Sequence, residues 1–98
     1  MPLSKDLVKP LETVDTDVAT EDPCQLIVWN DDVNTFEWVI ETLIDICGHS
    51  HEQAEQCAYI IHFRGKYAVQ YGTFDDMKRK AEAIIDRGIN ATVEGVPV

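Results

Sequence analysis

The stretch that decides the fold is Trp29-Asn30-Asp31-Asp32-Val33-Asn34-Thr35-Phe36-Glu37, where a short apolar run ends and a helical pattern begins. A second stretch, Ile61-His62-Phe63-Arg64-Gly65, places a histidine one turn before a glycine that can end a helix. Both stretches have apolar neighbours. An amide, two carboxylates and an imidazole beside apolar side chains can bind a small cation with an apolar body. This combination suggests recognition of the amino terminus of a peptide.

The residues around the first stretch predict a strand followed by a helix. Residues 25–29 form a short apolar run, long enough for a strand and too short for a helix. Asn34, with Glu37 three residues later, is typical of a capping box, so we expect Asn34 to cap the first helix. Apolar side chains then recur at helical spacing up to Cys47, and Gly48 predicts the end of the helix.

The rest of the chain predicts two further helices and two further strands. Ser50 and Gln53 form a second capping box. The apolar stripe of the helix that follows consists of Ala54, Cys57, Ala58 and Ile61. Thr73 begins a third helix, whose stripe consists of Met77, Ala81, Ile84 and Ile85. Residues 67–71 and 89–93 alternate in polarity, which predicts one strand before and one strand after this helix.

These elements predict an α+β fold in the order βααβαβ. We expect a three-stranded, mostly antiparallel sheet with three helices packed on one face. Residues 1–23 carry six acidic residues, two lysines and three prolines without an apolar period, so we expect a flexible acidic tail there. Residues 24–94 form the expected folded domain, and residues 95–98 a frayed carboxyl terminus.

Charge and cysteine content limit the classes of partner and the compartment. The net charge of -10 argues against nucleic acid and anionic membrane surfaces as partners. No stretch approaches the roughly 20 apolar residues that span a bilayer, and the first residues lack the apolar region of a secretory signal. Cys24, Cys47 and Cys57 are odd in number and lack metal-ligand spacing, so we expect reduced thiols. The sequence thus predicts a cytoplasmic protein.

Enzymatic and metal-binding functions are not predicted. The chain has no Gly-rich phosphate loop, nucleophile elbow or redox cysteine pair. Cys57 and His62 lie about 140° apart around one predicted helix, so they should not meet as a nucleophile and its base. His49 and His51 match no zinc spacing, and we expect both at the surface. We therefore expect no cofactor and no metal.

The Asn-Asp-Asp run also has a purely structural interpretation, because Asn and Asp side chains bond the local backbone at turns and helix starts. Together with the downstream His-x-x-Gly, however, it makes the chain from about residue 24 to 94 resemble the ClpS family, the adaptors of bacterial N-degron proteolysis. The resemblance runs through residues 28–32, Phe36, Glu37, Val39, Leu43, Ala54, residues 61–62, residues 65–66 and Lys80.

This resemblance implies an adaptor that holds proteins with a destabilising N-terminal residue (Leu, Phe, Tyr or Trp) and delivers them to a Clp-family AAA+ unfoldase. The implied partners are N-degron peptides and the N-terminal domain of the unfoldase, and we expect a monomer. The residues implied around the α-amino group are Asn30, Asp31, Asp32 and His62. Those implied around the side-chain pocket are Asn34, Phe36, Ala58, Ile61 and Ile89. His62 and Lys80, expected to be exposed near helix ends, are implied in docking on the unfoldase.

Three departures from the family pattern concern the pocket and its surroundings. Asn34 stands where Thr is usual, Phe36 and Ala58 stand where Met is common, and the link 86–88 is shorter than usual. The departures at Asn34, Phe36 and Ala58 support an alternative function, a regulatory module that docks on a Clp unfoldase without reading N-terminal residues. Binding of free against acetylated Phe-initial peptides separates the two functions.

Overall fold

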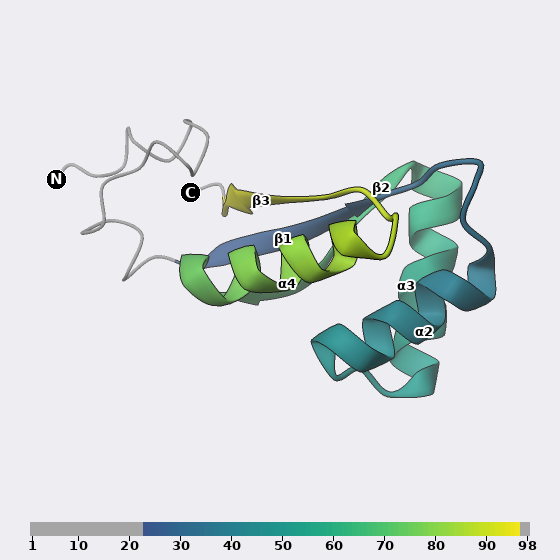
Figure 1. The fold of residues 1–98 in the computed structure, drawn as a ribbon, viewed down its shortest axis with the longest axis horizontal. Helices are drawn as coiled ribbons and strands as arrows, with labels where there is room; N and C mark the ends of the chain where they lie inside the picture. The colour runs from purple at the N-terminus through teal and green to yellow at the C-terminus, as the bar shows by residue number, and fades with distance from the viewer. Residues whose placement is uncertain (1–22, 97–98) are drawn as a thin grey trace, which may run out of the picture.

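The computed structural model describes residues 23–96, and Figure 1 shows their arrangement. The elements are β1 (Cys24–Trp29), α2 (Phe36–Cys47), α3 (His51–Arg64), β2 (Lys66–Gly72), α4 (Phe74–Asp86) and β3 (Ala91–Gly95). The predicted α+β fold and its βααβαβ order are confirmed. The expectations for residues 1–22 and 97–98 lie outside the described residues. None of the described helices is long and apolar enough to cross a membrane.

The central strand of the sheet is β1, which pairs antiparallel with β2 on one side and β3 on the other. This central position explains its apolar sequence, since Leu26 and Val28 are buried on the core side. The register with β2 shifts between Leu26 and Ile27, which leaves Val69 without a partner on β1 and forms a bulge. Both β2 and β3 are edge strands.

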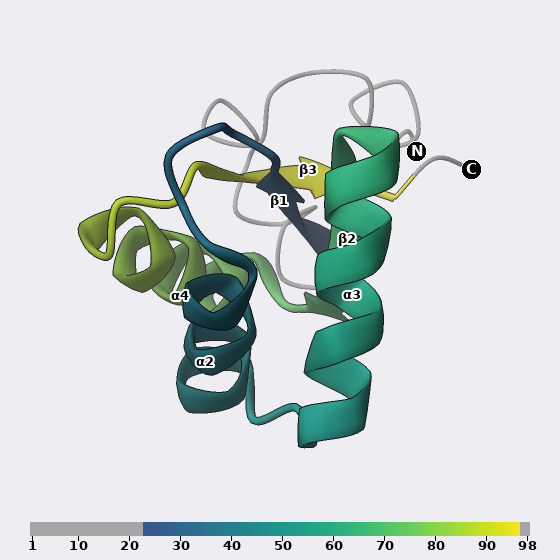
Figure 2. The ribbon, with the colours of Figure 1, turned by 90° about the vertical axis from the view of Figure 1, so that its right-hand side faces the viewer.

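The helices surround the core in two groups. Helix α4 lies along the sheet, whereas α2 packs against α3, and α3 in turn packs against β2 (Figures 1 and 2). The largest fully buried side chains come from β1, α2 and α4, and include Leu26, Val28, Leu43, Met77 and Ile84. Burying one such side chain contributes about 1.5–3 kcal/mol. The core therefore connects the end of β1 with α2, the helix that begins at the polar loop.

Polar residues begin each helix. Ser50 and Thr73 cap α3 and α4 as predicted. Helix α2 is capped by Thr35, whose hydroxyl accepts from the backbone N–H of Trp38 over 3.1 Å. The prediction that Asn34 is the cap was wrong, because the side-chain amide of Asn34 is bonded elsewhere. Two helices end in the predicted left-handed conformation, at Gly48 and Gly65.

Three predictions of exposure were also wrong. His49 is buried, with 6% of its surface exposed, because the link between α2 and α3 places it against β2, where it is hydrogen-bonded to the backbone of Val69. Ile85 is 49% exposed, since it lies about 100° around α4 from the buried Ile84. Lys80 is half-buried in the middle of α4, where its ammonium donates to the side chain of Gln70 over 2.8 Å and lies 3.5 Å from the carboxylate of Asp76.

Candidate functional site

Backbone hydrogen bonds hold the last residue of β1 and the first residue of the loop that follows it. The N–H of Trp29 donates to the carbonyl of Asn90 over 3.0 Å, and the N–H of Asn30 donates to the carbonyl of Gly65 over 2.9 Å. Gly65 directly follows the last turn of α3, the turn that carries His62. The second bond therefore brings the amide end of the loop to the helix end that presents the imidazole.

Asp31 organises the loop. Its Oδ1 accepts from the backbone N–H groups of Val33 and Asn34, both over 2.9 Å, and its Oδ2 accepts from Asn34 Nδ2 over 2.8 Å. The bond from the Asn34 backbone, foremost among these, holds the pKa of Asp31 below its ordinary value, although partial burial acts in the opposite sense. Both carboxylate oxygens of Asp31 are thus engaged, which gives Asp31 a structural role in this turn.

Asn34 connects this turn to a distant part of the chain. Besides its bond to Asp31, its Nδ2 donates to the backbone carbonyl of Gly88 over 2.9 Å. Gly88 lies in the short link between α4 and β3 and has a positive φ of 89°. The side chain of Asn34 therefore connects the α4–β3 link to the loop by hydrogen bonds. Because its amide is used in these bonds, Asn34 does not cap α2.

A cavity of about 290 Å³ lies beside this loop, between the start of α2 and the last two turns of α3. Its polar lining is formed by Asn30, Asp31, Asp32, Asn34, Thr35 and His62. Its apolar lining is formed by Phe36, Val39, Ala58 and Ile61. The volume is close to the lower end of the range found for ligand pockets, about 300 Å³. The cavity can therefore accept a group the size of one side chain together with a polar head.

Nearly every residue predicted for the pocket lines this cavity. The exception is Ile89, which is 2% exposed and borders a separate small void of about 10 Å³ together with Asn30, Asp31 and Ile61. Sequence reasoning missed Thr35 and Val39. The signal for Val39 was present, because it lies one helical turn after Phe36 and so shares its face of α2. Lys80 does not line the cavity.

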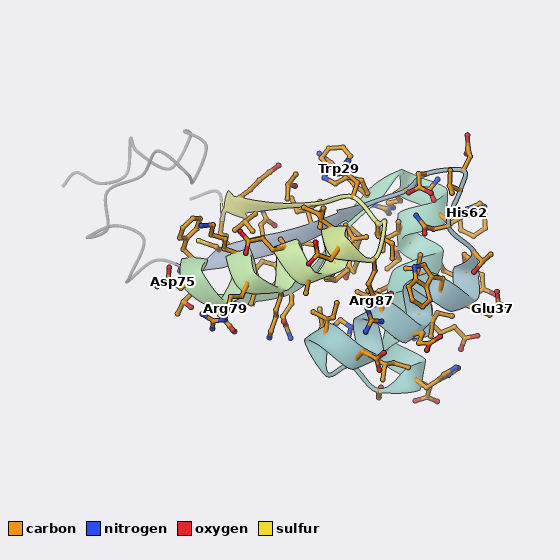
Figure 3. All side chains as sticks on the ribbon, in the orientation of Figure 1. Trp29, Glu37, His62, Asp75, Arg79 and Arg87 are labelled. Atoms are coloured by element: carbon orange, nitrogen blue, oxygen red, sulfur yellow. The ribbon has the colours of Figure 1, made fainter. Side chains whose placement is uncertain are left out.

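Three polar groups of the lining are available to a ligand. Asn30 and Asp32 are exposed, and no group within residues 23–96 hydrogen-bonds either side chain. His62 is also exposed, and it lies at the same end of the molecule as Glu37 of the first turn of α2 (Figure 3). An amide, a carboxylate and an imidazole that form no side-chain hydrogen bonds among the described residues can accept the N–H donors of an ammonium group.

Aromatic contacts position the apolar part of the lining. The ring of Phe36 stands edge-on to Tyr59, with centroids 4.9 Å apart, and edge-on to His62, with centroids 5.8 Å apart. Such pairs contribute about 0.5–1.5 kcal/mol beyond the burial of their surface. Phe36 is therefore held against α3, and the same contact positions the imidazole of His62, which lines the cavity.

The described residues offer binding groups rather than a catalytic arrangement. Within residues 23–96, no group of three or more His, Cys, Asp and Glu side chains is placed to hold a metal ion. Cys57 is buried, and burial raises the pKa of its thiol. His62 is exposed on another face of α3, so the predicted separation of Cys57 and His62 is confirmed. The cavity can bind and orient a ligand by hydrogen bonds and apolar contact.

The fold and the cavity together define a small α+β binding protein whose site combines an acidic polar loop with an apolar wall. The sequence profile of one family, described as the ATP-dependent Clp protease adaptor protein ClpS, matches residues 19–92. The chain belongs to this family of adaptors of the Clp protease. It is accordingly an adaptor and not an enzyme.

Individual relatives agree with this assignment. The adapter protein ClpS of Rhodococcus opacus is 28% identical over 83 residues, which are 85% of this chain and 74% of the relative. The protein of Streptomyces avermitilis is 31% identical over 72 residues, which are 74% of this chain and 69% of the relative. Agrobacterium tumefaciens ClpS2, solved bound to L-phenylalaninamide, matches with a TM-score of 0.71 at 22% identity, over 76% of this chain and 98% of that chain. At this identity the structural likeness concerns the fold.

Proposed function

We propose that this chain binds proteins whose N-terminal residue is Leu, Phe, Tyr or Trp and delivers them to a Clp-family AAA+ unfoldase. The observation that carries the proposal is the cavity of about 290 Å³, where the unoccupied polar groups of Asn30, Asp32 and His62 lie beside an apolar wall. The ligand of the solved relative, L-phenylalaninamide, has a free α-amino group and an apolar side chain. The two parts of the cavity suit these two parts of such a ligand.

The polar lining recognises the α-amino group. A free α-amino group has a pKa near 8, so it is mostly cationic at pH 7. Asn30 and His62 supply acceptors, and Asp32 supplies a carboxylate that has no partner within residues 23–96. Asp31 contributes its negative charge and holds the turn, since both of its oxygens already accept from Val33 and Asn34. Each hydrogen bond to the ammonium group contributes about 1.5–3 kcal/mol.

The apolar lining selects the N-terminal side chain. Burying a Leu or Phe side chain against Phe36, Ala58 and Ile61 contributes about 1.5–3 kcal/mol. A charged side chain would lose its hydration there without gaining a partner, so Asp- and Lys-initial peptides should not bind. A Gly-initial peptide brings no side chain to bury. For a ligand of this size we expect an affinity in the low micromolar range, about -8 kcal/mol.

Delivery involves other parts of the chain. In the proposed function, His62 and Lys80 contribute to docking on the N-terminal domain of the unfoldase, and the acidic residues 1–23 serve delivery rather than cargo binding. The Lys80 side chain keeps 25% of its surface exposed beside Asp76, which supports a charged contact there. The protein would act as a monomer in the cytoplasm, where the buried thiols of Cys47 and Cys57 stay reduced.

Fluorescence anisotropy with labelled peptides tests cargo recognition directly. A free Phe-initial peptide should bind, and the same peptide acetylated at its amino terminus should not, because acetylation removes the charge and donors that the polar lining requires. Asp-, Lys- and Gly-initial peptides serve as controls for the apolar wall. Failure of every free peptide to bind would favour the alternative, a module that docks on the unfoldase without reading N-terminal residues.

A further inference from the structure

A second and larger cleft, of about 530 Å³, lies on a different face of α3 from the candidate site. One side is the helical stripe formed by Gln53, Gln56, Cys57 and Ile60, and the other side is residues 67–71 of β2. The link 47–49 closes one end. Figure 2 shows α3 standing beside β2, the two elements between which the cleft lies. The cleft is thus a groove between a helix and a strand.

The strand side of this groove is a free sheet edge. Within residues 23–96, β2 pairs only with β1, so its other edge has no strand partner, although the backbone of Val69 is hydrogen-bonded to His49. Five consecutive residues of β2 line the groove. Because successive side chains of a strand point to opposite faces, a consecutive run indicates that the groove meets the strand along its edge. Such an edge can accept an extended peptide as an added strand.

The closed end of the groove has an unpartnered polar atom. His49 is 6% exposed and lines the groove, and its Nδ1 has no hydrogen-bond partner among residues 23–96. Burial lowers the pKa of His49, and a backbone hydrogen bond with Val69 acts in the opposite sense. A buried polar group without a partner costs about 1–3 kcal/mol. An N–H group of a bound peptide would give the imidazole that partner.

The chemistry of the groove favours an uncharged ligand. Although the chain has a net charge of -10, none of the described residues that line the groove is Asp, Glu, Lys or Arg. Gln53 and Gln56 are exposed and present amides, which both donate and accept, as peptide groups do. Tyr67 and Tyr71 are 38% and 58% exposed and add aromatic surface along β2. A charged side chain entering this lining would find no counter-ion.

From the strand edge, the buried imidazole and the neutral lining we propose that this groove is a second binding site, which takes an extended, uncharged segment of a partner protein as an added strand on β2. The site is independent of the proposed cargo pocket, because the two share no lining residue. The protein could then hold a partner at β2 while the first cavity is occupied. The volume of about 530 Å³ lies within the range of ligand pockets.

The probe for the test is the blocked pentapeptide acetyl-Thr-Val-Thr-Val-Thr-amide. Its acetylated end cannot satisfy the α-amino site, so failure of the proposed cargo function does not affect the result. Titration of the ¹⁵N-labelled full chain to about 5 mM covers the affinity expected for so short a ligand. Amide shifts should appear in residues 47–49, 53–60 and 67–71, and the Nδ1 resonance of His49 should move. Absence of shifts, or shifts centred on residues 30–36 and His62, would overturn the proposal.

Two variants and a charged probe examine the chemistry. Gln56→Glu places a charge in the groove at an exposed position. This variant should bind the neutral probe at least about fivefold more weakly than the wild type does, close to 1 kcal/mol. It should also weaken binding of an acidic probe, acetyl-Asp-Val-Asp-Val-Asp-amide, by at least the same factor. Asn90→Asp adds the same charge outside the groove and should leave binding of the neutral probe unchanged. Equal affinity of wild type and Gln56→Glu for the neutral probe, or tighter binding of the acidic probe, would contradict an uncharged strand site.

Removal of residues 1–22 identifies the source of the added strand. If the groove receives a partner, the truncated chain and the full chain should have the same shifts at residues 67–71 before any peptide is added, and the same affinity for the neutral probe. If truncation alone shifts these residues and strengthens probe binding, the groove is occupied by a segment of this chain, and the assignment to a partner is overturned.

Discussion

The backbone N–H of Asn30 donates to the carbonyl of Gly65 over 2.9 Å. This bond joins the end of the central strand β1 to the glycine that ends α3, so the polar loop and the last turn of α3 hold a constant relation to each other. The position of His62 relative to Asn30 then follows from the packing of the core rather than from flexible surface residues. A site arranged in advance in this way loses little ordering entropy when it binds a ligand.

Substitution of the two groups nearest to this bond tests the α-amino site. Asn30→Ala and His62→Ala should each weaken binding of a free Phe-initial peptide at least about tenfold, or 1.4 kcal/mol, because each removes a hydrogen bond to the ammonium group. Arg64→Ala, an exposed change in the same turn of α3 that does not line the cavity, should alter affinity less than about twofold. Anisotropy measures the affinities, and circular dichroism verifies folding. Wild-type affinity in both variants would exclude this site.

Asn34→Ala should affect both stability and binding. It removes the hydrogen bonds to Asp31 and Gly88, and we expect a loss of about 1–3 kcal/mol in the free energy of unfolding together with weaker peptide binding. Ser50→Ala is the matched control, since loss of the α3 cap costs about 1 kcal/mol without touching the loop. Urea unfolding and anisotropy measure the two effects. If both variants lose stability but neither loses affinity, the tie formed by Asn34 is irrelevant to binding.

Ala58→Met should change which N-terminal residue is preferred. Ala58 is 2% exposed and lines the cavity, so a longer side chain there must occupy part of the 290 Å³. Affinity for a Trp-initial peptide should fall several-fold more than affinity for a Leu-initial peptide, because the larger ring needs the space that Met fills. Glu55→Met adds the same side chain at an exposed position of α3 and should leave the ranking unchanged. Calorimetric titration gives the ranking, and an unaltered preference in Ala58→Met would show that Ala58 does not shape the pocket.

The stability of the protein should decrease as the pH falls below 6.5. The pKa of His49 in the folded state is lowered from 6.5, chiefly by burial, so the unfolded chain binds a proton at a higher pH than the native chain does. The free energy of unfolding therefore falls from pH 6.5 down through the folded pKa and is insensitive to His49 above that range. Asp31 contributes in a separate range. Its pKa is lowered from 3.8, so its stabilisation is complete above 3.8 and is lost at more acidic pH.

Urea unfolding at a series of pH values measures this dependence. His49→Leu should flatten the slope between pH 6.5 and the folded pKa, whereas His51→Leu, at an exposed position, should retain it. An identical slope in wild type and His49→Leu would assign the pH dependence to other groups.

Deletion of residues 1–20 should separate cargo binding from delivery. Affinity for a Phe-initial peptide should stay nearly unchanged, because every residue that lines the cavity lies between Asn30 and His62. Degradation of a Phe-initial substrate by purified unfoldase and peptidase should be impaired. The full-length protein and a shortened chain lacking only residues 1–5 provide the comparison. Full degradation with the truncated protein would show that the deleted segment has no part in delivery.

The local patterns of the sequence were sufficient for the fold. Caps at Ser50 and Thr73, the left-handed ends at Gly48 and Gly65, and the periodicities between them are properties of neighbouring residues, so they can be read without knowledge of the tertiary structure. Most of the candidate pocket was predicted from the resemblance to the ClpS family, whose short motifs fall here on one loop and on the faces of two helices.

Only the tertiary structure decided the contacts between segments far apart in the chain. The bond from Asn34 to Gly88 moved the cap of α2 to Thr35, and the bonds of Lys80 to β2 and within α4 reduced its exposure. Burial placed His49 at the closed end of the groove beside β2. The sequence by itself determined which backbone conformations are locally favourable, and packing determined which polar groups meet, because a side chain's partner depends on the three-dimensional positions of all the elements at once.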